Sequence, residues 1–424
     1  MTFLYLFSYL ILFFGAVNLI RIFLFLIGSD IYGLVNHLNR KNSNKAPYQP
    51  KVSVVIPAYN EQATIIRCLN SVVNNAYPKH LLDILVVDDG SSDATNEVVE
   101  AFILKNADSN IKLVTQENSG KAHALNNAIR NHSTGSIIMC LDSDSYIEKD
   151  AIRNAAQYFK DESVAALSAN VKISEAEGLL NLIQKFEYIV CYQMKRAQTV
   201  FNIEYIIGGI GSTFRKSVLS EIGYFDTDTV TEDIDITMKI IRNGNKTYRA
   251  IYGSDVIAYT ESVLDVRGLI KQRYRWKWGR SQTFFKNRKM FFNKDAKFTK
   301  GLTFIYLPFA IFGDFAFLLE PLLLAFLVFI SIYFKNPLTL LSAMAVFIFY
   351  LSLNIFAEDT ISTKDKLKLV IIAPTMYFYF FILSFVEYVA LIKALLNLRH
   401  IKSSIEEARC SWDHVARRAV SINW

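Results

Sequence analysis

Residues 52–61 read VSVVIPAYNE, a short apolar run that ends in a polar cluster. The same pattern recurs at residues 84–92 as ILVVDDGSS and at residues 137–144 as IIMCLDSD. Apolar runs of this length, bounded by turn-forming residues, are typical of buried strands. Three polar clusters at three strand ends indicate one shared cleft more than three separate turns. These stretches therefore predict both the fold class and the place of a functional site.

Amphipathic stretches separate the apolar runs from residue 51 onward, so strands and helices are expected to alternate. Alternating units of this kind predict an α/β, Rossmann-like and mostly parallel sheet with helices on both faces. Ligands of such sheets bind beyond the carboxyl ends of the strands. The expected strands are Val52–Pro57, Ile84–Val87, Ile111–Val114, Ile137–Leu141 and Val164–Ala169. The expected helices are Glu61–Asn74, Ala94–Lys105, Lys121–Asn131 and Asp150–Lys160.

The composition adds a membrane component to this sheet. Of 424 residues, 52% are hydrophobic and 20% are charged, with a net charge of +7 and a mean hydropathy of +0.22. Soluble domains are about 45–50% apolar and about 25% charged, so this chain is shifted toward the membrane class. Disorder, collagen-like repeats and a disulfide scaffold are excluded. The four cysteines lie far apart without a C-x-x-C pair, which indicates neither a zinc site nor a disulfide framework.

Long apolar runs at both ends of the chain divide it into parts. The first run, Phe3–Ile27, exceeds the roughly 20 residues that cross a bilayer. A cleaved signal peptide is the alternative, but the run lacks a basic start and a cleavage site. The later runs are Leu302–Phe334, Pro337–Phe356 and Leu369–Leu398. The expected parts are a transmembrane helix (1–28), a linker (29–50), a catalytic domain (51–240), an acceptor and interface segment (241–300), transmembrane helices (301–398) and a basic tail (399–424).

The side of the membrane follows from the basic residues, most of which lie in the middle segment. The positive-inside rule places that segment in the cytoplasm of a multi-pass plasma-membrane protein. Three crossings after it would put the basic tail outside, against the same rule. The run Leu302–Phe334 is overlong and contains Asp314, Glu320 and Pro321, so an interfacial or re-entrant course stays open. The number of spans is therefore not fixed by the sequence.

Carboxylates after the strand at residues 137–141 predict a metal site. Asp142 and Asp144 are expected on the same side of an extended segment, close enough to hold one Mg²⁺ or Mn²⁺. Lys121 begins an expected helix and would add positive charge beside a bound diphosphate. The segment around it is too short for a P-loop, which argues against a Walker-type ATPase.

Two later motifs have competing interpretations. Thr231-Glu232-Asp233 precedes a helical pattern, so Thr231 is either a helix cap with acids in the first turn or part of a catalytic site. Residues 272–278 read QRYRWKW, an aromatic and cationic cluster. Such a cluster suits nucleic acid, a membrane interface, or a surface for stacking sugar beside phosphate. The adjacent apolar runs argue against nucleic acid as a partner.

Taken in order, these residues resemble a known family, the processive family 2 glycosyltransferases. That group includes the synthases of cellulose, chitin, hyaluronan and poly-β-1,6-N-acetylglucosamine. The resemblance covers about residues 50–290, and its most specific element is QxxRW, since the aspartates also occur in non-processive relatives. The motifs are PxYNE (57–61), DDGS (88–91), GKA (120–122), DxD (142–144), TED (231–233) and QxxRW (272–276).

The resemblance implies a GT-A fold and a set of site residues that bind a UDP-sugar, a metal-bound diphosphate and an acceptor. Asp233 would be the general base, and Glu232 is its neighbour in the catalytic acidic pair. The nucleoside would lie against Tyr59, Glu61 and Asp89. The diphosphate and metal would be bound by Asp142, Asp144 and Lys121. The acceptor side would be formed by Gly208, Gly209, Gln272, Arg275 and Trp276, although a flexible Gly-rich turn explains the two glycines equally well.

The resulting hypothesis is an inverting hexosyltransferase that polymerises UDP-N-acetylglucosamine into a β-linked exopolysaccharide of the biofilm type. Residues Thr231–Thr237 resemble the poly-N-acetylglucosamine synthases more than hyaluronan synthases. Their resemblance also implies passage of the product through the membrane helices, contact with membrane lipid and a small accessory membrane subunit. Alternatives are a non-processive enzyme with a lipid acceptor, a hyaluronan or chitin synthase, and a transporter or receptor with a nucleotide-binding domain.

Overall fold

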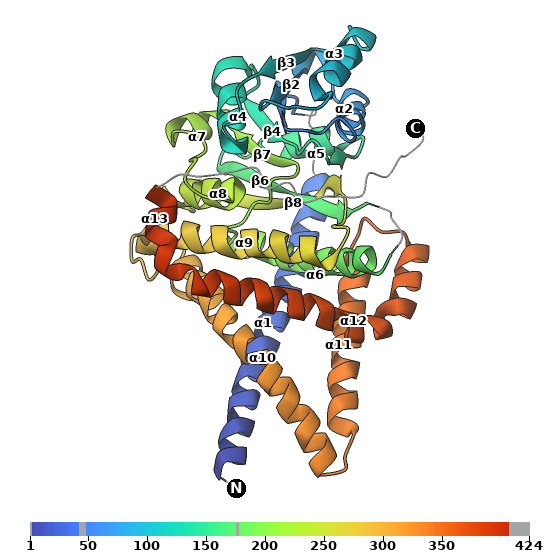
Figure 1. The fold of residues 1–424 in the computed structure, drawn as a ribbon, viewed down its shortest axis with the longest axis vertical. Helices are drawn as coiled ribbons and strands as arrows, with labels where there is room; N and C mark the ends of the chain where they lie inside the picture. Colours follow the sequence, from blue (N-terminus) through green and yellow to red (C-terminus); the bar gives the residue numbers. More distant parts are fainter. Residues whose placement is uncertain (1, 42–47, 175–177, 407–424) are drawn as a thin grey trace.

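A computed structural model describes residues 2–41, 48–174 and 178–406, and the expected basic tail lies outside them after Glu406. The molecule has three tiers (Figure 1). An α/β sheet domain forms one end, a layer of helices lies across its base, and further helices extend away from it toward the opposite end.

Four parallel strands form the half of the sheet that the sequence predicts. They are β1 (Val52–Ala58), β2 (Leu82–Asp88), β3 (Ile111–Thr115) and β4 (Ile137–Cys140), in the spatial order β3-β2-β1-β4. Every residue of β1 and β2 is buried, because helices cover both faces of the sheet. Side chains of β1 alternate between the two cores: Val54 and Ile56 face one and Val55 faces the other. The predicted fold class is confirmed.

The helices between these strands begin later or end earlier than expected. They are α2 (Ile65–Val73), α3 (Thr95–Lys105), α4 (Lys121–Asn127) and α5 (Ala151–Tyr158). Glu61 forms a turn before α2, because its carbonyl oxygen accepts hydrogen bonds from the amides of Thr64 and Ile65. Helix α4 widens after Asn127 into a π-helical turn, Ala128–His132.

The other half of the sheet mixes directions, in the order β4-β7-β6-β8-β5. Strand β7 (Ser212–Arg215) is antiparallel to both β4 and β6 (Val164–Ile173). Strand β8 (Arg249–Thr260) lies between β6 and β5 (Tyr146–Ile147). The sheet thus includes residues beyond 240, where the sequence analysis ended the catalytic domain. Two short helices, α7 (Lys216–Glu221) and α8 (Glu232–Arg242), complete this half.

Three helices form the layer at the base of the sheet, and others extend away from it (Figure 1). The layer contains α6 (Leu179–Phe201), α9 (Val266–Lys286) and α12 (Thr363–Leu396), which share an apolar core with α11. The extended helices are α1 (Thr2–Lys41), α10 (Leu307–Tyr333) and α11 (Leu338–Ala357). A short helix, α13 (Ile401–Glu406), follows α12.

Four helical segments are long and apolar enough to cross a membrane: Gly15–Leu38, Gly301–Tyr333, Leu340–Ala357 and Thr363–Leu396. The overlong run after residue 301 is one helix that begins with a π-helical turn, Gly301–Tyr306, and continues through α10. This run therefore does not form a re-entrant loop. Pro321 lies inside α10, and Asp314 faces cationic side chains of α9.

Helix α1 packs closely on α6 through a glycine. A Cβ atom at Gly28 would lie 2.8 Å from Cε2 of Phe201 and 2.9 Å from Cβ of Ala197. One turn later, the Tyr32 hydroxyl donates a 2.7 Å hydrogen bond to the carbonyl oxygen of Tyr252 in β8. The end of α1 is thus joined directly to the sheet domain.

We expect Gly28→Ala to lower the thermal unfolding midpoint of the detergent-purified protein, because the added methyl overpacks this contact. Overpacking of this kind costs about 1–3 kcal/mol. Gly15→Ala is the matched control, since a Cβ atom there meets nothing within 4 Å. Equal midpoints for the two variants would contradict the close packing of α1 on α6.

Candidate active site

A cavity of about 650 Å³ lies between the sheet and the helix layer. Eight of the thirteen residues predicted for the site line it: Lys121, Asp142, Gly208, Gly209, Glu232, Asp233, Arg275 and Trp276. Side chains of α1, α6, α10 and α12 also contribute to its wall, among them Phe25, Tyr188, Phe309 and Glu387. The cavity therefore connects the strand ends with the extended helices.

A triad of charges joins three of the predicted motifs at this cavity. The Lys121 ammonium lies 2.8 Å from Oδ1 of Asp142 and 2.6 Å from Oε1 of Glu232. Burial opposes the positive charge of Lys121, but the carboxylates of Asp142 and Glu232 outweigh it and raise the pKa of this lysine. A cation is thus held at the place where α4 and α8 begin.

Asp233 is held by backbone amides from two segments. Its Oδ2 accepts a 3.0 Å hydrogen bond from the amide of Gly209, and its Oδ1 accepts one of 2.8 Å from the amide of Ile234. Burial and the neighbouring Glu232 carboxylate raise the pKa of Asp233 to about 6, although Lys121 acts in the opposite direction. A carboxylate with such a pKa is suited to accept a proton near neutral pH.

The helix-cap interpretation of Thr231 is wrong as far as its side chain is concerned. Helix α8 begins at Glu232, but the Thr231 hydroxyl makes no capping hydrogen bond. Helix α9 packs directly against the Thr231 side chain: a Cβ atom at Gly279 would lie 2.1 Å from Oγ1 of Thr231. Only glycine at position 279 allows this approach of α9 to the residue before the acidic pair.

Asp142 and Asp144 do not lie on an extended segment as expected. They form a turn after β4, in which the amide of Ser145 donates a 3.0 Å hydrogen bond to the carbonyl oxygen of Asp142. This turn follows the end of β4 at Cys140. The Asp142 side chain lines the cavity, while Oδ1 of Asp144 accepts a hydrogen bond from the Ser145 hydroxyl. Both side chains still offer carboxylate oxygens, which are the ligand type that Mg²⁺ and Mn²⁺ prefer.

The three residues expected at the nucleoside lie at the ends of β1 and β2, outside the lining of this cavity. Asp89 is buried, and its carboxylate accepts hydrogen bonds from the amides of Ser119 (3.0 Å) and Gly120 (2.7 Å). Gly90 has a φ of +77°, and a Cβ there would lie 2.8 Å from the amide nitrogen of Asn118. Tyr59 and Glu61 lie in the loop after β1. Asp89 thus fixes the loop that leads to Lys121.

Helix α9 presents its predicted residues unequally. Arg275 and Trp276 line the cavity, and the Arg275 guanidinium lowers the pKa of Asp233, though less than burial raises it. Trp276 stacks with the Arg273 guanidinium, 4.3 Å from the ring centre. Gln272 is buried and is not part of the lining. Of the three fixed residues of the QxxRW element, only Arg275 and Trp276 therefore line the cavity.

The sequence analysis missed an ion-pair network on the side of the cavity that faces α10 and α12. Arg273, Lys277 and Arg280 lie on one face of α9, since they are spaced by four and three residues. The three cations share three acids, each of which comes from a different helix: Glu187 of α6, Asp314 of α10 and Glu387 of α12. Single acids within apolar helices and the basic spacing in α9 were the available signals.

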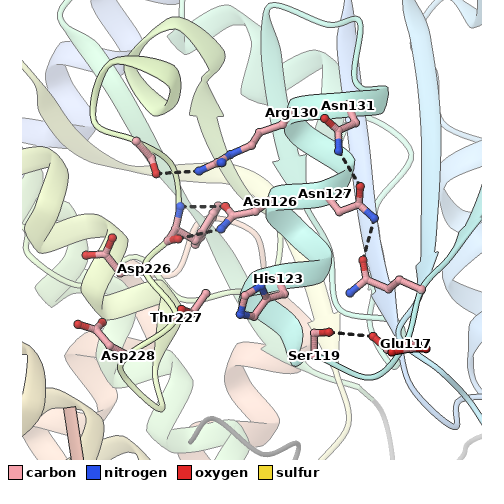
Figure 2. A pocket seen from close by; sticks show the side chains of 13 residues that line it. Glu117, Ser119, His123, Asn126, Asn127, Arg130, Asn131, Asp226, Thr227 and Asp228 are labelled. Atoms are coloured by element: carbon pink, nitrogen blue, oxygen red, sulfur yellow. Dashed lines mark hydrogen bonds between the residues drawn. The ribbon is translucent and has the colours of Figure 1, made fainter. Parts of the chain in front are cut away.

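A second cavity, of about 840 Å³, lies along α4 (Figure 2). None of the residues predicted for the site is among those that line it. Asn126 exchanges two hydrogen bonds with the backbone of Phe225, and Arg130 donates one to the carbonyl oxygen of Gly223. These contacts attach α4 to the loop that leads into α8. They therefore fix the distance between Lys121 and Glu232, which begin these two helices.

Lys286 secures the same loop to α9. Its ammonium lies 3.1 Å from Asp226, 2.6 Å from Asp228 and 2.8 Å from Asp235. These three carboxylates lie close enough to hold a metal ion, but the ammonium already bonds to each of them. The amide of Val230 also donates a 3.1 Å hydrogen bond to Oε1 of Gln282. One face of α9 thus positions the segment that carries Glu232 and Asp233.

Comparison with known proteins agrees with this geometry. Residues 53–223 match the family model of glycosyl transferase family 2. They therefore form a family 2 glycosyltransferase domain, the class that the fold and the motifs predict. Among individual proteins, the chain is similar to poly-β-1,6-N-acetyl-D-glucosamine synthases of two staphylococci. The one from Staphylococcus aureus (strain COL) is 34% identical over 246 residues, 57% of each chain. The one from Staphylococcus epidermidis is 34% identical over 263 residues, 60% of this chain and 61% of that protein.

These matches span less than two thirds of each relative's length. A solved structure supports the fold over more of the chain. It is a mannosyltransferase from Pyrobaculum calidifontis in complex with GDP-Man and Mn²⁺, with a TM-score of 0.54 and 23% identity. The similarity covers 90% of this chain and 97% of that one. The two chains therefore share their fold over this length. In this chain, a GT-A-like sheet domain is followed by apolar helices.

Asp226 keeps its ion pair with Lys239 when Lys286 is replaced, but the buried Asp235 and the neighbouring Asp228 lose their cation. We therefore expect Lys286→Met to destabilise the protein by roughly 3 kcal/mol. This is the lower end of the range for a broken buried pair, since Asp226 and Asp228 are about one third exposed. Burial already raises the pKa of Asp235, so the folded variant binds protons more tightly than the unfolded chain. Its stability deficit should therefore be smaller at pH 5 than at pH 7.

Thermal unfolding of the two proteins at both pH values measures this difference. Lys289→Met removes the same charge from an exposed neighbouring position and is the matched control. A deficit of equal size in the two variants would show that Lys286 acts only through the net charge.

Proposed function

We propose that the chain is a processive, inverting glycosyltransferase that polymerises UDP-N-acetylglucosamine into a β-linked polysaccharide and passes it across the membrane. The observation that carries the proposal is the single cavity that joins Asp233, Arg275 and Trp276 and continues to α10. The similarity to poly-β-1,6-N-acetyl-D-glucosamine synthases supports the choice of sugar.

The donor binds at the strand ends in this proposal. Tyr59, Glu61 and Asp89 contact the nucleoside, and Asp142 and Asp144 hold Mg²⁺ or Mn²⁺ beside the diphosphate. A bound divalent ion neutralises charge on the departing phosphate. The carboxylate oxygens of both aspartates suit such an ion, and the similar mannosyltransferase structure contains Mn²⁺.

Sugar transfer requires one displacement. Asp233 removes the proton from the acceptor hydroxyl, whose oxygen then bonds to the anomeric carbon as the bond to the diphosphate oxygen breaks. Because the attack occurs opposite the leaving group, an α-linked donor yields a β-linked product. The positive charges of Lys121 and Arg275 stabilise the negative charge that develops on the leaving UDP.

The acceptor end lies against Trp276, and Gly208 and Gly209 border it where side chains would narrow the cavity. The cavity wall also contains Phe309, Gly313 and Phe317 of α10. In this proposal the growing product passes between the helices from there. The sheet domain lies on the cytoplasmic side of the plasma membrane in this proposal. Membrane lipid surrounds the helices, and a small accessory subunit is the expected partner.

Incubation of the purified protein with labelled UDP-N-acetylglucosamine and Mg²⁺ or Mn²⁺ tests the proposal. We expect a polymer whose formation stops with EDTA, and linkage analysis should find β-bonds. A product enlarged by one sugar only would contradict processivity and favour a lipid-acceptor enzyme. Faster turnover of another UDP-sugar would contradict the proposed donor.

We expect Asp233→Asn to reduce the turnover number by roughly 10²–10⁴-fold, the range for loss of a positioned general base. Affinity for UDP should stay within a few-fold, because Asp233 contacts the acceptor hydroxyl and not the nucleoside. Release of UDP and equilibrium binding of UDP measure the two effects. Asp108→Asn, which neutralises an exposed aspartate, is the control. Unchanged turnover in Asp233→Asn would exclude it as the base.

Transfer should also depend on pH, because only the ionised form of Asp233 accepts a proton. With a pKa of about 6, kcat/KM should fall about tenfold per pH unit below this value. Glu232→Gln should move the inflection to lower pH, since the Glu232 carboxylate raises the pKa of Asp233. A flat profile between pH 5 and pH 8 would be incompatible with this assignment.

A further inference from the structure

Helix α2 holds the backbone of the turn that carries the two expected metal ligands. Two adjacent residues of this helix donate hydrogen bonds to the turn. The Arg67 guanidinium donates one of 3.0 Å to the carbonyl oxygen of Asp144. The Cys68 thiol donates a longer one, of 3.6 Å, to the carbonyl oxygen of Asp142. Because both bonds end on backbone oxygens, they hold the turn without using the carboxylate oxygens of either aspartate.

The segment after the turn is attached to the same face of α2. The Ser71 hydroxyl oxygen accepts a 3.2 Å hydrogen bond from the amide of Ile147. Just after the end of α2, Asn75 donates one of 2.9 Å to the carbonyl oxygen of Glu148. Arg67, Ser71 and Asn75 are spaced by four residues, as expected for neighbours on one helical face. The turn and β5 are therefore positioned as one unit by α2.

A buried ion pair fixes the Arg67 side chain. The nitrogen that donates to Asp144 also lies 2.6 Å from Oε1 of Glu261, and the side chains of the pair are only 9% and 1% exposed. Glu261 directly follows β8, at the start of the chain that leads to α9. The Arg67 guanidinium also lies over the Tyr146 ring, 4.8 Å from its centre. Arg67 thus connects the turn, β5 and the chain between β8 and α9.

The charge of Glu261 decides how Arg67 acts on the turn. A guanidinium without a partner would be costly at a buried position. Beside Asp142 and Asp144 it would also repel a divalent cation and compete for their carboxylates, since guanidinium groups bind carboxylates strongly. Glu261 offsets this positive charge and keeps the guanidinium directed at the carbonyl oxygen of Asp144. The pair therefore combines a donor for the backbone with little net charge near the metal ligands.

We propose that Arg67 and Glu261 are positioning residues of the metal site, which hold Asp142 and Asp144 in the orientation that binds the divalent ion. This role rests on the proposed function, in which the two aspartates are the metal ligands. Replacing a residue that orients metal ligands typically lowers metal affinity by about 10–100-fold. Because Glu261 lies in the chain that leads to α9, the pair also fixes the metal ligands relative to the helix of the acceptor side.

Binding of Mn²⁺ to the detergent-purified protein with saturating UDP tests the proposal, and electron paramagnetic resonance of free Mn²⁺ measures the dissociation constant. We expect Arg67→Met and Glu261→Gln each to weaken Mn²⁺ binding about tenfold. Affinity for UDP in EDTA should stay within a few-fold, because the expected nucleoside residues follow β1 and β2. The Mn²⁺ concentration that gives half-maximal turnover should rise by the same factor as the dissociation constant, with a much smaller change in kcat.

Arg67→Lys keeps the charge next to Glu261 but loses the planar fork, so its Mn²⁺ affinity should lie between those of the unchanged protein and Arg67→Met. Arg196→Met is the matched control, because Arg196 is also a buried arginine and stacks on Tyr32 and Tyr192 away from the turn. It should lower the thermal unfolding midpoint without weakening Mn²⁺ binding.

Unchanged Mn²⁺ affinity in Arg67→Lys and Glu261→Gln would overturn the proposal, even if Arg67→Met does not fold. An equal loss of affinity in Arg196→Met would overturn it as well, because Arg67 would then act only through the stability of the domain. If the unchanged protein itself bound no Mn²⁺ in the presence of UDP, the metal assignment of the proposed function would be wrong, and the positioning role with it.

Discussion

Pairing of the charges on α9 is the constraint on which the rest of the molecule depends. This helix lies between a polar site and apolar helices, and its cations would be costly there without partners. Arg273, Lys277 and Arg280 are paired with acids contributed by α6, α10 and α12. Since each acid comes from a different helix, the pairing fixes all three helices around α9.

The opposite end of the same helix determines the geometry of the chemistry. Three of its residues contact the segment before and at the start of α8. Gly279 packs against Thr231, Gln282 accepts a hydrogen bond from the amide of Val230, and Lys286 forms ion pairs with the nearby aspartates. Arg275 and Trp276 lie one to three turns earlier in the same helix. One rigid helix therefore positions the acidic pair, Glu232 and Asp233, relative to Arg275 and Trp276. Movement of α9 relative to α10 and α12 would therefore displace Asp233 as well as Trp276.

Sequence alone predicted the parallel half of the sheet, because each of its strands is a short apolar run between turn residues. Strands β7 and β8 were missed, since their place in the sheet depends on pairing with β4 and β6 across long stretches of chain. The sequence analysis placed Lys121, Asp142 and Asp233 in one site, and all three line the cavity. Lys121 and Asp142 come after β3 and β4, whereas Asp233 lies in the first turn of α8. The site prediction was less accurate for Asp144 and Gln272, whose side-chain directions depend on a turn and on helix packing.

One of the two apolar cores beside the sheet combines residues that the ribosome makes at very different times. Val55 and Leu85 of the sheet share it with Leu302 and Leu307 at the start of α10. The sheet domain therefore emerges before the residues that complete its core, after α1 has already been made. During synthesis an apolar surface of the domain stays uncovered until α10 is available, which makes the docking of that helix a step in the folding of the catalytic domain itself.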